Sequence, residues 1–249
     1  MPFDRDLLAA AIAALATYDW GDDGRVLKSL DEAVIAAHDD PVLRTALEGS
    51  LTTILAGAGS RAAKDHACRR LALVGGADCV PHLAALLDDP ALSHPARQAL
   101  ERIEDAAAAV ALRGALATAA GGRRIGVIAS LAARGDADAV PLLAGMLTAE
   151  APLAAAAARA LGRLALPAAA AALATAPEGA AAEVRAAVVD ARLACADAML
   201  RRGDREAARR IYDAIAMAVG ETPVSHRDRA VRIAARRGML ACLDEAAAG

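Results

Sequence analysis

Apolar residues recur at three- and four-residue steps along most of the chain, as at Leu43, Leu47, Leu51 and Ile54. This spacing places the apolar side chains on one stripe of an α-helix and leaves the other faces polar. The pattern predicts about 14 helices. They are expected near residues 4–19, 25–38, 41–56, 60–74, 78–88, 92–104, 106–119, 122–134, 137–148, 151–165, 167–175, 179–202, 204–219 and 225–237.

Capping residues between the stripes support these boundaries, because Asp, Ser and Pro favour helix starts and Gly favours helix stops. The predicted starts are marked by Pro41, Ser60, Asp78, Pro95 and Asp136. The predicted stops are marked by Gly57, Gly75, Gly135, Gly203 and Gly238.

The helical pattern repeats. Three segments that begin at Val80, Val110 and Val140 align without gaps and start 30 residues apart. The intervening helices end in similar motifs whose leucines are Leu71, Leu100, Leu131 and Leu161. One period therefore holds one helix pair. We expect an all-α fold, an α-solenoid of about seven antiparallel pairs, as a single array over residues 1–249.

Composition agrees with a helical array. Hydrophobic residues make up 57% of the chain and aromatic residues only 2%, and 74 of the 249 residues are alanine. Alanine is the best helix former, and its small side chain allows close helix packing. The stretch Ala168–Ala172, between Pro167 and Pro177, is predicted to pack most thinly, because alanine alone forms its stripe.

Mean hydropathy is positive, at +0.33, which raises the question of a membrane protein. The longest uncharged run, residues 164–177, contains two prolines and is shorter than the roughly 20 residues needed to span a bilayer. The N-terminus lacks the positive region of a signal peptide. We expect a cytoplasmic protein, unless a leader has been removed.

Residues 139–164 match a short helical repeat at Val140, Pro141, Glu150, Leu153, Ala156, Ala157, Ala160, Leu161, Gly162 and Leu164. The segment resembles a HEAT repeat of the short bacterial, phycobilisome-lyase type, although Ala154 stands where that family usually has Arg. A second match runs through Val80, Pro81, Asp88, Leu92, Ala96, Ala99, Leu100 and Ile103. The clearest resemblance therefore spans about 60–165.

Near the C-terminus, Ala208 and Tyr212 have the spacing of the second half of a tetratricopeptide unit, and the pair at about 192–219 resembles such a unit. Both families are α-solenoids, and the resemblance implies a role in binding proteins on an extended concave surface. The chain ends soon after a predicted helix stop, which is compatible with one module of a longer repeat protein.

The cysteines, histidines and serines are the residues with the potential for metal binding or catalysis. Four cysteines form no CxxC pair and lie in apolar helical patterns, so buried free thiols are expected. His66, Cys68, Cys79 and His82 could hold zinc, but positions 66 and 68 point about 200° apart on a helix. Ser–His neighbours do not face each other on a helix, and no phosphate-binding loop is present. We predict no catalytic residue, cofactor or metal.

Arginine supplies 26 of the 28 basic residues, although the net charge is −3. Arg102, Arg159 and Arg163 recur at equivalent places on second helices. We define the second-helix ridge as these three with Arg69 and Gln98, and predict that it pairs with acidic groups of a partner. The alternative is an ordinary solvated helix face.

Two of the four aromatic residues, Tyr18 and Trp20, stand at the end of the first predicted helix. They are interpreted either as a hydrophobic cap on the open end of the array or as a hot spot for a partner.

The resemblance and the ridge together favour a non-catalytic scaffold that binds another protein through its concave surface. One alternative is a HEAT-like nucleic-acid-binding or base-excision protein, but net charge −3 and 2% aromatic residues argue against nucleic acid. Another is a lyase-type HEAT protein, for which no residue here carries a lyase role.

Overall fold

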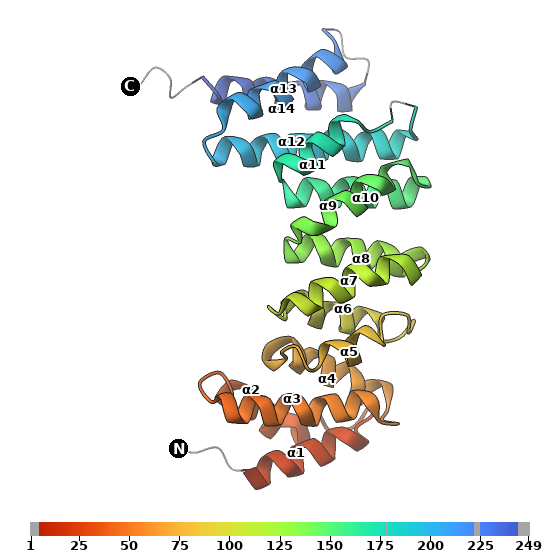
Figure 1. Ribbon diagram of the computed structural model, residues 1–249, viewed down its shortest axis with the longest axis vertical. Coiled ribbons are helices and arrows are strands. Elements are labelled where there is room, and N and C mark those ends of the chain that lie inside the picture. Colours follow the sequence, from red (N-terminus) through yellow and green to blue (C-terminus); the bar gives the residue numbers. More distant parts are fainter. Residues whose placement is uncertain (1–4, 178, 222–224, 244–249) are drawn as a thin grey trace. The chain divides into compact units, whose positions relative to one another are not determined.

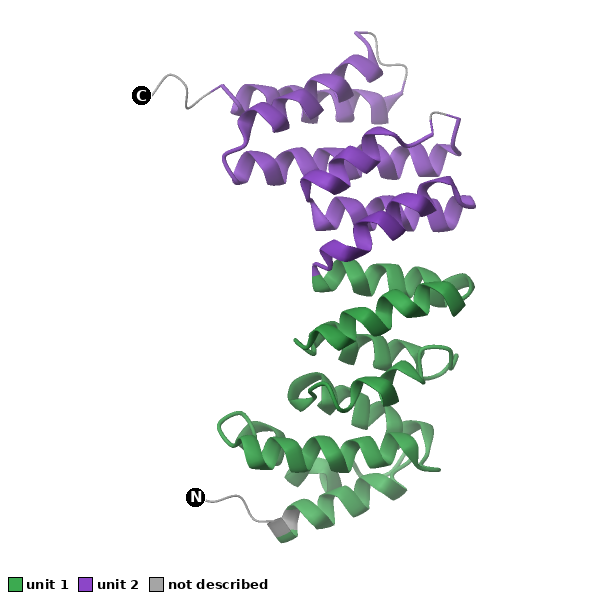
Figure 2. Ribbon diagram, in the orientation of Figure 1, with its two compact units in different colours: residues 1–134 green, residues 135–249 purple. Residues whose placement is uncertain are grey.

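The computed structural model describes residues 5–177, 179–221 and 225–243. Over these residues the protein is all-helical, with 14 α-helices, three short 3-10 helices and no strand (Figure 1). The predicted all-α fold class is confirmed. Figure 2 shows that the chain forms two compact units: unit 1 is residues 1–134 and unit 2 is residues 135–249.

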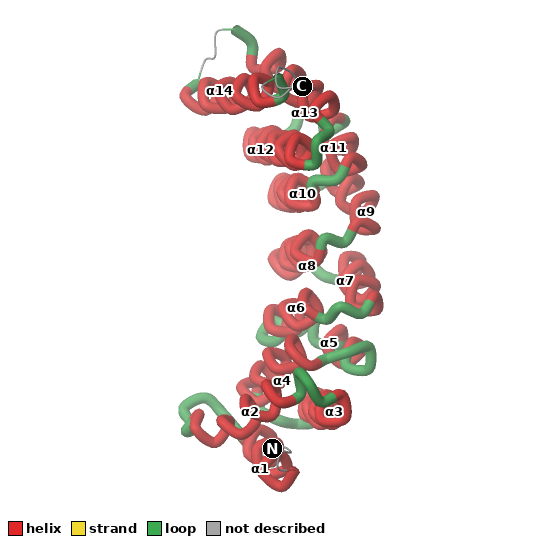
Figure 3. The backbone as a smooth tube through the Cα atoms, turned by 90° about the vertical axis from the view of Figure 1, so that its left-hand side faces the viewer, coloured by secondary structure: helices red, strands yellow, loops and turns green. Residues whose placement is uncertain are grey.

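Unit 1 is built from helices that alternate between two layers, with α4, α6 and α8 in one and α3, α5 and α7 in the other (Figure 3). Consecutive helices pack as pairs, and each helix also contacts the next helix of its own layer. The elements are α1 (Arg5–Thr17), η1 (Gly24–Leu27), α2 (Lys28–Ala36), α3 (Pro41–Ala56), α4 (Arg61–Val74), α5 (Val80–Ala84), α6 (Ser93–Arg102), α7 (Ala106–Thr118) and α8 (Gly121–Arg134).

Unit 2, taken by itself, also has two layers of alternating helices, with α10, α12 and α14 in one layer and α9, α11 and α13 in the other (Figure 3). Its elements are η2 (Ala137–Ala139), α9 (Val140–Gly145), η3 (Met146–Thr148), α10 (Ala151–Leu164), α11 (Pro167–Ala174), α12 (Ala182–Arg201), α13 (Arg205–Val219) and α14 (His226–Ala241).

Local capping explains where many helices start. The Ser60 hydroxyl accepts a hydrogen bond from the Ala63 N–H, as predicted for the start of α4. Pro41 occupies the first turn of α3, where a missing N–H costs nothing, and the Asp40 carboxylate caps the free N–H groups beside it. Gly57 and Gly75 end α3 and α4, also as predicted.

Some predictions of single elements were wrong. Gly238 does not stop a helix: it lies inside α14, which continues to Ala241. The helix expected at 137–148 is divided into η2, α9 and η3, and the α-helical part of 78–88 is only Val80–Ala84. In both places hydrogen bonds of the i→i+3 type replace the α-helical ladder, as from Leu87 N–H to Ala84 C=O.

The core consists of small aliphatic side chains. The repeated leucines Leu71, Leu100 and Leu131 are fully buried in unit 1, and Leu161 is fully buried in unit 2. Around Ala168–Ala172, where thin packing is predicted, the buried residues of α11 are Ala169 and Leu173, so the buried stripe of the helix includes a leucine. All four cysteines are buried and free, as expected.

Candidate partner-binding surface

Three residues of the predicted second-helix ridge come together in unit 1. Arg69 on α4 and Gln98 and Arg102 on α6 line one groove of about 320 Å³, which we call the α4–α6 groove. Its remaining lining residues are Ala72, Leu73, Pro95 and Glu101. These three residues meet because α4 and α6 are neighbours in one layer. On each helix, residues three and four positions apart lie on the face that lines the groove.

The charged side chains of the α4–α6 groove differ in whether they have a hydrogen-bond partner. Arg69 Nε donates to Asp65 Oδ2 at 2.8 Å, and Glu101 Oε1 accepts a hydrogen bond from Ser130 Oγ at 2.6 Å. Arg102 is exposed and has no hydrogen bond or ion pair within the described part of the chain. Arg102 is therefore the groove's free positive charge.

Apolar surface lies beside this charge. Leu73 is 55% exposed on α4 and lines the same groove. Pro95 supplies a second apolar wall from the first turn of α6. A free guanidinium next to exposed aliphatic surface suits a partner segment that has an acidic residue close to an apolar one.

The other two ridge residues belong to unit 2. Arg159 and Arg163 are exposed on α10, one helical turn apart, and neither makes an ion pair within the described residues. They therefore share one face of α10. That one ridge runs through all five positions stays a prediction, since Arg69, Gln98 and Arg102 lie in the other unit.

The two aromatic residues after α1 have different environments. Tyr18 is buried: its ring lies edge-on to the His66 ring, with centroids 5.0 Å apart, and its backbone oxygen accepts a hydrogen bond from the Ser60 hydroxyl. Trp20 is 58% exposed, with its ring centroid 5.9 Å from that of His66. Tyr18 therefore serves packing, and Trp20 is the surface aromatic of the two.

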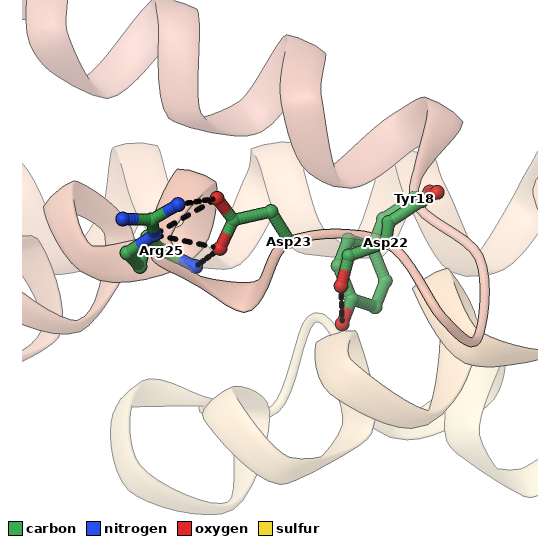
Figure 4. Close-up of polar contacts among 4 residues, drawn as sticks. All are labelled: Tyr18, Asp22, Asp23 and Arg25. Carbon is green, nitrogen blue, oxygen red and sulfur yellow. Dashed lines mark hydrogen bonds and ion pairs between the residues drawn. The ribbon is translucent and has the colours of Figure 1, made fainter.

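Polar contacts hold the loop that presents Trp20 (Figure 4). The Tyr18 hydroxyl donates to the backbone oxygen of Asp22 at 3.4 Å, and Asp23 pairs with Arg25 at 2.7 Å. Hydrogen bonding from Arg25 lowers the pKa of the Asp23 carboxyl. The backbone N–H of Trp20 donates to Asp19 Oδ1 at 2.8 Å, so contacts within the loop itself hold its turn.

Beneath the aromatic pair lies a buried arginine that the sequence pattern did not identify. Arg70 donates to Asp31 Oδ1 at 2.7 Å and lies 3.0 Å from His66 Nδ1. The spacing of His66 and Arg70 by one helical turn is visible in the sequence. The pairing with Asp31 on α2 depends on how the helices pack, so no local pattern indicates it.

The described part of the chain has no cluster of side chains suited to a metal ion. There, no three His, Cys, Asp or Glu side chains gather as a metal site. Burial raises the pKa of the Cys68 and Cys79 thiols to about 12 each, which keeps both thiols protonated near neutral pH. Within the same residues, no helix combines the length and the apolar character that crossing a membrane requires.

Comparison with known proteins gave no relative: the chain matches no protein-family model and no curated protein. The resemblance to HEAT and tetratricopeptide repeats rests on the motifs described above.

Proposed function

We propose that this protein is a HEAT-like α-solenoid scaffold that binds another protein at the α4–α6 groove, without catalysis. The observation that supports the proposal most directly is the unpaired Arg102 beside the exposed Leu73 in one groove. Arginine is enriched among the residues that dominate binding energy at protein interfaces, and complementary charge favours the correct partner over others.

The fold supports the same function. Helix pairs that contact only their neighbours expose a long row of second-helix residues, and such rows are the binding surfaces of α-solenoids. Trp20 extends the surface of unit 1 with an aromatic residue, the type most enriched at interface hot spots. The partner is a protein with an acidic residue next to an apolar one.

The test compares two charge reversals that change net charge equally. Arg102→Glu places a carboxylate in the α4–α6 groove, whereas Arg61→Glu changes an exposed residue in the first turn of α4, outside the groove. Partners are captured by each variant and by the wild type and are quantified by mass spectrometry. We expect Arg102→Glu to lose the specific partner and Arg61→Glu to retain it, because like charge at an interface is strongly unfavourable.

Equal loss from both variants would mean that net charge alone governs capture. Retention by both would reject the α4–α6 groove and direct attention to Trp20. The double variant Arg159→Glu with Arg163→Glu tests the ridge separately. If it loses the same partner as Arg102→Glu, the partner reaches both units.

A further inference from the structure

Unit 2 has a pocket of its own, apart from the proposed groove. It has a volume of about 440 Å³ and lies between α12, α13 and the first turns of α14. Its walls are aliphatic, from Val189 on α12, Ile215 and Val219 on α13, and Val231 on α14. Its polar lining comes from Arg185, Arg192, Arg227 and Asp228. A volume of roughly 300–1,000 Å³ is usual for a small-ligand site, in which a few polar groups fix the orientation of the ligand.

The polar groups of this pocket differ in how well they are paired. Arg227 donates to Asp190 Oδ1 at 2.8 Å and to the Ala186 backbone oxygen at 3.1 Å. The Asp228 carboxylate accepts a hydrogen bond from the hydroxyl of Ser225, the N-cap residue of α14, at 2.7 Å. These groups already have partners.

Arg192 is different. It is half-buried on α12, lines the pocket, and has no hydrogen bond or ion pair from any other described residue. Burial lowers the pKa of the Arg192 guanidinium, and no carboxylate opposes that effect. Arg185, two helical turns earlier on α12, also lines the pocket and donates to the Ala180 backbone oxygen.

A guanidinium that is partly withdrawn from water loses some of its hydration, and a bound anion would replace those hydrogen bonds. We propose that this pocket binds a carboxylate carried on a short aliphatic body, with Arg192 holding the carboxylate and the walls at Val189, Ile215 and Val231 holding the aliphatic part. One guanidinium presents two parallel N–H groups, which match a single carboxylate.

This chemistry has two sources: a free aliphatic acid, or the C-terminal carboxylate of a peptide that ends in aliphatic residues. Calorimetry on the full chain with octanoate and with acetyl-Ala-Ala-Leu-Leu tests them separately. Binding of either supports the site and identifies its source. Octan-1-ol and the amidated peptide lack the carboxylate, so each should bind at least about tenfold more weakly than its acid, the usual effect of losing a charged hydrogen bond.

Arg192→Met removes the guanidinium and keeps an unbranched apolar chain. We expect binding at least about tenfold weaker, with an unchanged or higher melting temperature, because the variant no longer buries an unpaired charge. Arg192→Lys keeps the charge without the paired N–H groups and should bind with intermediate strength. The matched control is Arg229→Met, an exposed arginine on α14 that does not line the pocket.

Three results would overturn the proposal: no binding of either acid, equal binding by Arg192→Met and wild type, or tighter binding of octyl phosphate than of octanoate. If Arg192→Met proves too unstable to measure, equal binding by Arg192→Lys and wild type is the result that rejects the paired N–H geometry. The pocket lies wholly in unit 2, so failure of this test leaves the α4–α6 groove unaffected.

Discussion

Gly238 of α14 lies directly against the aromatic ring of Tyr212 on α13: a β-carbon built at Gly238 would overlap Tyr212 Cζ. The ring cannot easily move away. Tyr212 is almost fully buried among Met199, Ile215 and Val231, and its hydroxyl donates to the Asp197 carboxylate. The absence of a side chain at Gly238 is what lets α13 and α14 approach each other.

We therefore predict that Gly238→Ala destabilises unit 2. Alanine is a better helix former than glycine by about 1 kcal/mol, but forcing a methyl group into a packed site costs typically about 1–3 kcal/mol. With the buried ring fixed at its hydroxyl, the steric cost should exceed the helical gain. Urea unfolding followed by circular dichroism measures the balance.

The control is Gly114→Ala on α7. Gly114 is also within a helix, and a β-carbon there would meet nothing within 4 Å. This substitution should stabilise the protein by roughly 0.5–1 kcal/mol. Stabilisation by both substitutions would show that the Tyr212 ring yields to the added methyl group.

The same glycine marks the limit of what the sequence could predict. Helix starts such as Ser60 and Pro41 were predictable because capping involves residues two or three positions apart. Gly238 was misread as a stop because its role depends on Tyr212 in the preceding helix. A residue's own neighbours in sequence do not contain that information.

The candidate sites divide in the same way. Arg69 and Arg102 could be placed on one surface because the repeat fixes equivalent positions on successive second helices. The pair of Arg70 with Asp31, and the pocket around Arg192, form between helices whose relative register no local pattern specifies. The repeat period therefore predicts which residues share a helix face. Which residues meet between two helices can be read only from the structure.

Charges placed at the repeated leucines should unfold their own units. Leu131 and Leu161 are fully buried in unit 1 and unit 2. An aspartate at either position would be an unpaired buried charge, which costs several kcal/mol out of a typical total of about 5–15 kcal/mol. We expect Leu131→Asp and Leu161→Asp to lose helical signal or to melt far below wild type by circular dichroism.

Exposed apolar residues supply the matched controls for these substitutions. Val110 on α7 is 58% exposed and Leu142 on α9 is 44% exposed. Val110→Asp and Leu142→Asp should change stability by no more than about 0.5 kcal/mol, as is usual for surface positions. Unfolding as severe as that of the core variants would contradict the assigned helix faces.

Stability should decrease in mild acid because of His66. Burial, and next the charge of Arg70, lower the pKa of the His66 imidazole below its ordinary value of 6.5. As pH falls through 6.5 the unfolded chain takes up a proton that the folded protein binds less readily, so the free energy of unfolding decreases. The contribution is complete above pH 6.5 and is lost as pH falls through the lower folded-state pKa.

Urea unfolding at pH 7.5 and 5.5 measures this decrease. His66→Gln should show a smaller difference between the two pH values than wild type, because it has no imidazole to protonate. His38→Gln, which replaces an exposed histidine after α2, is the control and should keep the wild-type difference. An undiminished difference in His66→Gln would assign the pH dependence to other groups.

The four cysteines should react in an order set by burial and local opening. The pKa of the Cys68 thiol is raised to about 12, first by burial and then by the Asp65 charge, so raising the pH to 9 ionises little of it. Cys242 follows α14 directly, where helix ends open most readily. Labelling of the native protein with a maleimide, read by peptide mass spectrometry, should modify Cys242 first and Cys68 last.

In 8 M urea all four should label at similar rates, since the unfolded chain exposes every thiol. Native labelling of Cys68 as fast as Cys242 would show that α4 is not the protected core of unit 1.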